Sequence, residues 1–253
     1  MSKKERWSAV KRAIKLVEYD SIGSTNAEAK EYAKRTSERE SVLFVAREQS
    51  AGRGRLGRSF LSRRGQGIYM SLLYFTSEEL SDAISVTSAA AVVVARAIED
   101  TVGERMRIKW VNDIYNSRGK VAGILAEALS LGDVNAMVVG IGINIGEEDF
   151  PEELRGVASS IGVVSEEQRE KIIFDIADGI LSHAESCTDK SFMDEYRARS
   201  LLDGETVELF SAGESLGICR VVGVDDDGGL VVLFEGESEV RVIRTGEVSV
   251  RKR

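Results

Sequence analysis

The stretch Glu48-Gln-Ser-Ala-Gly-Arg-Gly-Arg-Leu-Gly-Arg-Ser-Phe60 lies between two segments of strand character and decides which folds remain open. Residues 42–47 before it and 67–75 after it are rich in β-branched and aromatic residues, which predicts two strands. Within the stretch, Gly52 to Gly57 matches the pattern G-x-G-x-x-G of dinucleotide-binding proteins. In those proteins a helix follows the third glycine. A strand is predicted here instead, so the sequence argues against a Rossmann fold.

The same stretch carries a local excess of positive charge. Between positions 47 and 64 there are six arginines and one acidic residue, although the whole chain of 253 residues has a net charge of −8. Glycine lets a backbone approach a ligand closely, and guanidinium groups bind phosphate oxygens in bidentate fashion. Arg53, Arg55 and Arg58 therefore predict a polyphosphate ligand. The alternative is a solvated basic loop that pairs with acidic parts of the surface.

Composition narrows the classes of function. The chain has one histidine, His183, and two cysteines, Cys187 and Cys219. A zinc site of Cys and His ligands, or a disulfide framework, needs more of these residues. We therefore interpret the spacing of His183 and Cys187 on one predicted helix as structural. The net charge also argues against non-specific binding of nucleic acid, which needs an extended basic surface. Arginine, lysine and carboxylates must then carry any catalytic chemistry.

The sequence predicts a cytoplasmic protein without a membrane partner. Residues 1–15 are basic, but they lack the apolar stretch that follows the charges of a signal peptide. No apolar run elsewhere approaches the roughly 20 residues of a membrane-spanning helix.

Hydrophobic periodicity and turn residues divide the chain into two predicted domains, residues 1–202 and 203–253. Capping boxes that begin at Thr25 and Ser165 mark two helix starts. Further along, short β-branched runs after residue 203 alternate with Gly, Asp and Ser turns, which is typical of a small barrel. Within the first domain we predict helices over 27–35, 84–101, 165–185 and 192–199, and further strands over 14–19, 106–110, 121–131 and 134–145.

The arginine loop is one of several motifs whose order and spacing resemble those of the biotin protein ligases. The others are Lys109-Trp-Val-Asn-Asp113, Lys120-Val-Ala-Gly-Ile-Leu125, Gly140-Ile-Gly-Ile-Asn144, Ser24-Thr-Asn26 and Gly246-Glu-Val-Ser-Val-Arg251. The resemblance implies an α+β fold, with a mixed sheet and helices like the catalytic domain of class II aminoacyl-tRNA synthetases, followed by a small Src-homology-3-like β-barrel. It also implies an activity. Members activate biotin with ATP to biotinyl-5′-adenylate and transfer the biotinyl group to one lysine of a biotin carboxyl carrier domain.

The resemblance also implies roles for individual residues. Lys120 is the expected central catalytic residue, since its ammonium can bridge the biotin carboxylate and the α-phosphate. Arg55 is the second catalytic candidate, within a loop that closes over the adenylate. The residues expected at biotin are Ser24, Thr25, Asn26, Gln49, Gly52, Arg53, Arg55, Lys120, Gly123, Leu125, Gly140 and Gly142. Those expected at ATP are Arg53, Arg55, Arg58, Phe60, Asn112, Lys120, Asn144 and Arg251, with Asp113 as a ligand of magnesium.

The sequence departs from the family pattern at three positions. The family usually has proline where Val111 stands, often tryptophan where Phe60 stands, and commonly a proline near Arg63. No charged group is lost, so these departures bear on affinity more than on activity. Residues 1–13, which precede the first predicted strand, are too few for the winged-helix domain of repressor members. We therefore expect no repressor function and no DNA partner, while a homodimer is compatible with the sequence.

Two other functions are compatible with parts of the sequence. A lipoate or octanoate ligase would share the catalytic fold, but the glycine-arginine loop disfavours it. A non-enzymatic module that binds nucleic acid through the basic loop and the small barrel is disfavoured by the net charge of −8.

Overall fold

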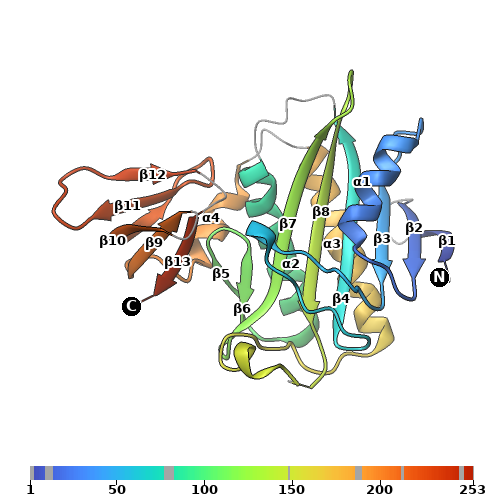
Figure 1. The fold of residues 1–253 in the computed structure, drawn as a ribbon, viewed down its shortest axis with the longest axis horizontal. Helices are drawn as coiled ribbons and strands as arrows, with labels where there is room; N and C mark the ends of the chain where they lie inside the picture. Colours follow the sequence, from blue (N-terminus) through green and yellow to red (C-terminus); the bar gives the residue numbers. More distant parts are fainter. Residues whose placement is uncertain are drawn as a thin grey trace.

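The structure is a computed structural model that describes residues 3–8, 14–76, 83–147, 149–185, 190–211, 214–244 and 248–252. Its larger part is an eight-stranded mixed sheet in the order β1-β2-β3-β4-β8-β7-β6-β5 (Figure 1). Strands β2 and β3 run parallel, and the other neighbours in this sheet are antiparallel. The strands are β1 (Lys3–Ser8), β2 (Ile14–Tyr19), β3 (Val42–Ala46), β4 (Gly67–Thr76), β5 (Arg107–Lys109), β6 (Asp113–Tyr115), β7 (Lys120–Ser130) and β8 (Asn135–Asn144).

Helices cover both faces of this sheet. Strand β3 shows why, because its side chains alternate between two separate hydrophobic clusters. Leu43 and Val45 belong to the cluster that includes residues of α2 and α3, whereas Val42 and Phe44 pack with residues of α1. A strand buried on both faces appears in sequence as a continuous apolar run. The helices are α1 (Thr25–Arg35), α2 (Ala83–Val102), α3 (Glu166–Glu185) and α4 (Phe192–Ala198).

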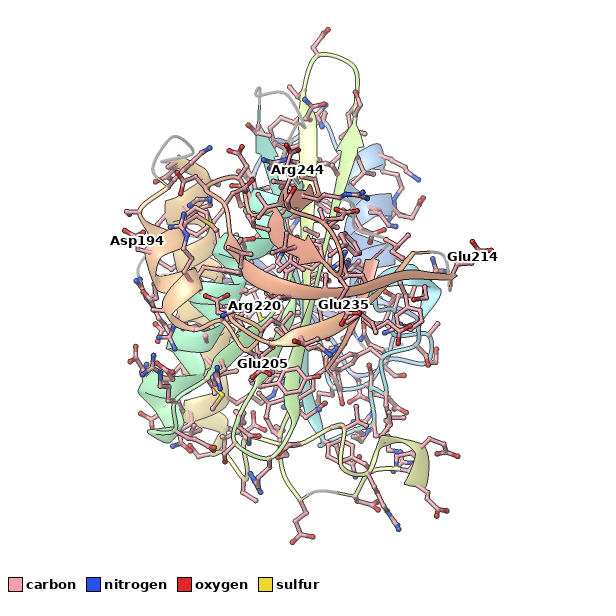
Figure 2. All side chains as sticks on the ribbon, turned by 90° about the vertical axis from the view of Figure 1, so that its left-hand side faces the viewer. Asp194, Glu205, Glu214, Arg220, Glu235 and Arg244 are labelled. Carbon is pink, nitrogen blue, oxygen red and sulfur yellow. The ribbon has the colours of Figure 1, made fainter. Side chains whose placement is uncertain are left out.

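The C-terminal part of the chain forms a second, five-stranded antiparallel sheet in the order β12-β11-β10-β9-β13. It lies beside α4 and β5 in Figure 1, and Figure 2 looks onto it, with Arg220 and Glu235 among its labelled charged side chains. Its buried residues belong to the same hydrophobic cluster as α2 and α3. The strands are β9 (Thr206–Ser211), β10 (Glu214–Val224), β11 (Leu230–Phe234), β12 (Arg241–Ile243) and β13 (Val248–Lys252).

The predicted mixed sheet with helices is confirmed, and the differences are local. Strands β1 and β6 were not predicted, because both are short segments in which charged and polar residues interrupt the apolar pattern. The capping box at Ser165 is confirmed, since the Gln168 N–H donates to Ser165 Oγ and the Ser165 N–H donates to Gln168 Oε1. The capping box at Thr25 is wrong: Ser24 is the N-cap, and its side chain accepts from the Ala27 N–H.

No helix among the residues that the structure describes is long and apolar enough to cross a membrane.

Candidate active site

A cavity of about 420 Å³ lies on the α1 side of the sheet, bounded by the β3–β4 loop, the β5–β6 hairpin, β7, β8 and the segment after β8. Its size is typical of a site for a small molecule. Most of the residues that the sequence nominated meet in it, although they come from five separate motifs. These lining residues are Ser24, Thr25, Asn26, Gln49, Arg53, Arg55, Arg58, Phe60, Asn112, Asp113, Lys120, Gly123, Leu125, Gly140, Gly142 and Asn144.

Two nominated residues are not among them. Gly52 is buried, and a Cβ there would lie 2.5 Å from the Phe60 carbonyl oxygen and 2.6 Å from Ser62 Oγ. Gly52 thus lets the arginine loop fold against itself and does not line the cavity. Arg251 lies on β13, but its side chain is outside the part of the chain whose side chains the structure describes.

One end of the cavity is a hydrogen-bonded network of neutral polar groups. The Thr25 N–H and hydroxyl both donate to Gln49 Oε1, at 2.8 Å and 3.1 Å. Gln49 Nε2 in turn donates to Ser62 Oγ at 3.1 Å. Because a backbone N–H can only donate, the Gln49 amide must direct its oxygen toward Thr25 and its nitrogen toward Ser62. Because Ser24 is the N-cap of α1, Thr25 lies against Gln49. The Thr25 hydroxyl therefore bonds the Gln49 side chain and is not the capping group that the sequence predicted.

The floor of the cavity is formed by glycines of two adjacent strands. In the β7–β8 ladder Gly123 pairs with Gly142, and Leu125 pairs with Gly140. A Cβ on Gly140 would overlap the side chain of Asn26, and one on Gly142 would lie 2.5 Å from the Phe60 ring. Side chains from α1 and from the arginine loop therefore rest directly on the sheet backbone. The glycines thus leave a flat slot over the sheet, which Asn26 and Phe60 partly occupy and which larger residues at these positions would close.

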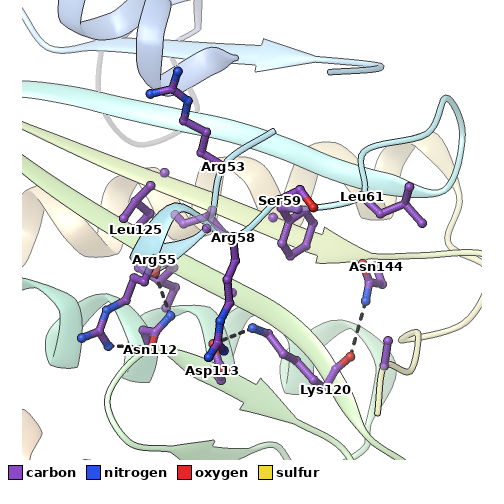
Figure 3. Close-up of a pocket in the computed structure, with 18 of the residues that line it drawn as sticks. Arg53, Arg55, Arg58, Ser59, Leu61, Asn112, Asp113, Lys120, Leu125 and Asn144 are labelled. Carbon is purple, nitrogen blue, oxygen red and sulfur yellow. Dashed lines mark hydrogen bonds and ion pairs between the residues drawn. The ribbon is translucent and has the colours of Figure 1, made fainter. Parts of the chain in front are cut away.

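The other end of the cavity is cationic. Lys120, the first residue of β7, donates from Nζ to Asp113 Oδ1 at 2.7 Å, and both side chains are about one-quarter exposed. Arg55 donates from its guanidinium to Asn112 Oδ1 at 2.8 Å. Figure 3 shows Arg58 extending toward the same region, whereas the side chain of Arg53 points the other way. Of the three loop arginines, Arg58 is thus directed toward the Lys120–Asp113 pair and Arg55 toward Asn112.

The backbone around Lys120 is held by the segment that follows β8. The Lys120 N–H donates to the Val157 carbonyl at 2.9 Å, and the Ser159 N–H donates to the Lys120 carbonyl at 2.8 Å. Asn144 Nδ2 bonds the Ser159 carbonyl at 2.9 Å and lies 3.4 Å from the Lys120 carbonyl (Figure 3). Asn144 therefore positions the backbone beside the lysine.

Burial and like charges perturb the ionisable groups of this end. Burial lowers the pKa of Lys109, with Lys120 and Arg58 adding to the effect and Asp113 opposing it. Burial also lowers the pKa of Arg55, and it raises the pKa of Tyr115 to about 12. Cations kept close together in a partly dehydrated site are stabilised by a bound anion. This arrangement predicts an anionic ligand.

Several lining residues were missed from the sequence. Lys109 is the first residue of the Lys109–Asp113 motif, and no role was predicted for it. Its positive charge within that motif is the signal from which it could have been found. Phe150, Leu154 and Val157, which we call the apolar wall, line the cavity, and the Val157 carbonyl accepts from the Lys120 N–H; Leu61 of the β3–β4 loop also lines it. Three of these lie in the irregular segment after β8, which has no periodicity from which its direction could be predicted.

The described residues contain no cluster of three or more His, Cys, Asp and Glu side chains that could hold a metal ion. His183 makes an edge contact with the Phe192 ring, 4.7 Å between ring centroids. Cys187 lies outside the described residues. Cys219 is buried in β10.

Comparison with known proteins agrees with this geometry. Residues 19–144 match the model of the biotin/lipoate A/B protein ligase family. The bifunctional ligase/repressor BirA of Bacillus spizizenii is 32% identical over 252 residues, which cover 93% of this chain and 74% of that protein. The biotin–[acetyl-CoA-carboxylase] ligase of Mycobacterium tuberculosis is 29% identical, over 89% of this chain and 85% of that protein.

A solved structure is similar along nearly the whole chain. The biotin protein ligase from Aquifex aeolicus in complex with biotin and ATP has a TM-score of 0.78 and 28% identity, and the similarity covers 94% of this chain and 99% of that one. Fold, motif residues and sequence identity thus lead to one assignment. The chain belongs to the biotin/lipoate A/B protein ligase family and is one of its biotin protein ligases.

Proposed function

We propose that this chain is an ATP-dependent ligase that forms biotinyl-5′-AMP from biotin and ATP and then transfers the biotinyl group to one lysine of a biotin carboxyl carrier domain. The observation that carries the proposal is the division of a single cavity into a neutral polar end, a glycine floor and a cationic end, with Lys120 at the cationic end. Biotin has a neutral bicyclic head and an anionic tail, and ATP brings the phosphates.

The neutral end is suited to a ureido ring. Ser24, Thr25, Asn26 and Gln49 provide acceptors and donors that neighbouring groups already hold in place. Thr25 and Gln49 bond to each other, Ser24 accepts from the Ala27 N–H, and Asn26 donates to the Leu125 carbonyl. Leaving the polar atoms of a buried ring unpaired would cost about 1–3 kcal/mol each. The floor of Gly123, Gly140 and Gly142 would hold the flat bicycle and direct its valeryl tail toward Lys120.

The first half-reaction needs charge stabilisation more than proton transfer. An oxygen of the biotin carboxylate attacks the α-phosphorus of ATP, the bond from that phosphorus to the bridging oxygen breaks, and pyrophosphate leaves. The carboxylate is already ionised at neutral pH, so no base has to act. Lys120 would bring the two anions together and stabilise the charge that develops at phosphorus. Asp113, which accepts from Lys120, would orient the ammonium.

The nucleotide would occupy the cationic end. Arg55 and Arg58 are directed there, and Arg53 would have to turn in order to reach the phosphates (Figure 3). The apolar wall of Phe150, Leu154 and Val157 is suited to the face of an adenine, and Phe60 would contact the base from the loop side. Asn112, Asn144 and Arg251 complete the proposed ATP set.

Magnesium is the metal expected with a polyphosphate. Asp113 is the one carboxylate among the described residues that line the cavity. This fits the usual mode of Mg²⁺, which binds through one or two carboxylates together with substrate phosphates and waters. When bound, the ion would neutralise charge on the phosphates.

The second half-reaction transfers the activated biotin. The amine of the carrier lysine attacks the acyl carbon of biotinyl-5′-AMP, the acyl–oxygen bond breaks, AMP leaves, and the attacking nitrogen loses a proton. Closure of the loop from Arg53 to Arg58 would keep water from the mixed anhydride until the carrier arrives.

A labelling assay tests the proposal. The chain is incubated with ATP, magnesium, biotin and a biotin carboxyl carrier domain, and biotin on the carrier is measured together with biotin-dependent pyrophosphate exchange. Labelling and exchange are expected; their joint absence would overturn the proposal. Competition of lipoate against biotin in the same assay separates biotin ligation from lipoate or octanoate ligation. Salt-sensitive binding to DNA or RNA without any labelling would favour the nucleic-acid module instead.

Several finer expectations belong to the same proposal. The division into residues 1–202 and 203–253, a Src-homology-3-like barrel for the second sheet, and a catalytic domain like that of class II aminoacyl-tRNA synthetases stay predictions. The same holds for cytoplasmic location, a homodimer, and the absence of a repressor function and a DNA partner.

A further inference from the structure

The amide of Asn26 is held in one orientation by a backbone carbonyl and by a carboxylate that plays no part in the proposed reaction. Asn26 lies in the first turn of α1 and is 6% exposed. Its Nδ2 donates to the Leu125 carbonyl at 3.2 Å and to Glu127 Oε2 at 2.9 Å. A carbonyl and an ionised carboxylate can only accept, so the amide nitrogen must face them. The amide oxygen is thereby turned to the opposite side, toward Gly140 in the floor of the cavity.

Glu127 is itself fixed. It lies on β7, and its Oε1 accepts from Lys30 Nζ at 2.7 Å, with both side chains less than one-third exposed. Lys30 is one helical turn beyond Asn26 on α1. The two carboxylate oxygens are thus divided between two residues of the same helix, which ties that helix face to β7. Rotation of the carboxylate away from Asn26 would break the ion pair.

Ser71 supports the same orientation from the other side. It lies on β4 with no exposed surface, and its Oγ is 2.7 Å from Thr25 Oγ1 and 2.5 Å from Asn26 Oδ1. Thr25 gives its own hydrogen to Gln49, and Oδ1 of an amide has none. Ser71 must therefore donate, and it does so toward both oxygens. A shared hydrogen leaves Oδ1 with capacity to accept from a ligand.

We propose that Glu127 is a positioning residue that sets the hydrogen-bond polarity, and so the ligand specificity, of the neutral end of the cavity. By holding Nδ2, it keeps Asn26 Oδ1 as an acceptor over the glycine floor, where it selects a ring that offers an N–H donor. The inference rests on the proposed function, since it takes this end as the site of the ureido ring.

The test replaces the acceptor by a group that can also donate. Glu127→Gln keeps the shape of the side chain, but it removes the charged one of the two acceptors that hold Nδ2, so the turned amide, with Nδ2 toward the cavity, becomes more populated. Dissociation constants are measured by calorimetry for biotin and for the two carbamate analogues in which a ring oxygen replaces one ureido N–H. One of the two analogues lacks the N–H that would donate to Asn26 Oδ1. We expect the parent to bind biotin about tenfold or more tightly than this analogue, and we expect Glu127→Gln to lose most of that difference.

Glu31→Gln is the matched control, because Glu31 is also a carboxylate paired with a lysine on α1, at 2.7 Å from Lys34, but is more than half exposed. It should leave all three dissociation constants unchanged. An unchanged preference in a folded Glu127→Gln would overturn the inference. So would an equal loss of affinity for biotin and both analogues, since that would mean a merely structural role. If the parent itself fails to bind biotin, the proposed function fails, which is a distinct result.

Discussion

At the scale of single residues, the cationic end depends on two side chains that the sequence nominated. Lys120 is paired with Asp113, and Arg55 is paired with Asn112, so both cations are directed by neighbours in the Lys109–Asp113 motif. A paired lysine keeps its position before substrate binds, which lowers the cost of ordering it later.

Lys120→Ala should abolish most adenylate formation. The variant loses the ammonium that stabilises charge at the α-phosphorus, and removal of one such group costs roughly 10²–10³-fold in rate. Biotin-dependent pyrophosphate exchange measures this step. Lys171→Ala, which removes a lysine of an exposed ion pair on α3, is the control. A Lys120→Ala variant with a nearly normal rate would refute the assignment.

Arg55→Gly should weaken retention of the adenylate. The variant loses the bond to Asn112 and a cation whose pKa burial lowers, so activated biotin escapes at a rate about tenfold higher or more. Labelling of free amines in solution reports the escape. Arg55→Met separates the lost charge from the added flexibility of glycine, and Arg63→Gly is an exposed control in the same connection between β3 and β4. Equal retention by the parent and both Arg55 variants would contradict the closing loop.

At the scale of elements, the register between β7 and β8 builds the slot. The pairs Gly123 with Gly142 and Leu125 with Gly140 put three glycines on the face that α1 and the arginine loop cover. A shift of one residue would turn these glycines to the other face and fill the slot with side chains.

Gly142→Ala should displace the Phe60 ring, since the new Cβ would lie 2.5 Å from it. We expect biotin affinity to fall about tenfold, as overpacking of a close contact costs about 1–3 kcal/mol. A double-mutant cycle with Phe60→Leu should recover part of this loss, because the two changes share one contact. Gly23→Ala, where a Cβ meets nothing within 4 Å, is the control. Strictly additive losses would show that Phe60 does not lie on Gly142 in solution.

At the scale of the whole molecule, the two sheets share one hydrophobic cluster and are joined next to the candidate active site. Trp110, which lines the cavity, donates from Nε1 to the Gly228 carbonyl in the β10–β11 turn at 2.8 Å. Arg197 of α4 bonds the same hairpin, since it donates to the carbonyl of Val224, the last residue of β10, at 2.9 Å. The second sheet is thus attached to the Lys109–Asp113 motif of the candidate active site.

A charged network beside this junction should make stability depend on pH. Burial raises the pKa of Glu99, but hydrogen bonds from Arg199 and the Met106 N–H outweigh it, and the pKa lies below its usual range. Its contribution to stability is present above the unfolded-state pKa of about 4.3 and is lost as pH falls through the folded-state pKa. The free energy of unfolding should therefore decrease between about pH 5 and pH 3.

Glu99→Gln should flatten that dependence and, near neutral pH, lower the free energy of unfolding by about 1–3 kcal/mol, because the Arg199 guanidinium loses one of its two charged partners and keeps only Glu195. Urea titrations at several pH values measure both effects. Glu31→Gln, at an exposed pair, should change little. A pH profile identical to that of the parent would show that Glu99 titrates alike in the folded and unfolded chain.

The sequence by itself determined most of the elements and most of the residues of the candidate site. Apolar runs and turn residues identified the helices and nearly all the strands, because local periodicity encodes which face of an element is buried. The motifs identified Lys120, Arg55 and the slot glycines, because their chemistry and order are properties of the chain. Strands β1 and β6 were not predicted, since short strands with polar and charged residues show no such periodicity.

Only the tertiary structure decided which residues meet across long separations. Asn26 and Glu127 are 101 residues apart, and Trp110 and Gly228 are 118 apart. The apolar wall comes from a segment without periodicity, and the hydroxyl of Thr25 serves Gln49 instead of a cap. The physical reason is that the position of a residue in the local periodicity specifies on which face of its helix or strand the side chain lies. The residue that it contacts across the fold depends on strand register and helix packing, which the packing of the whole hydrophobic core determines.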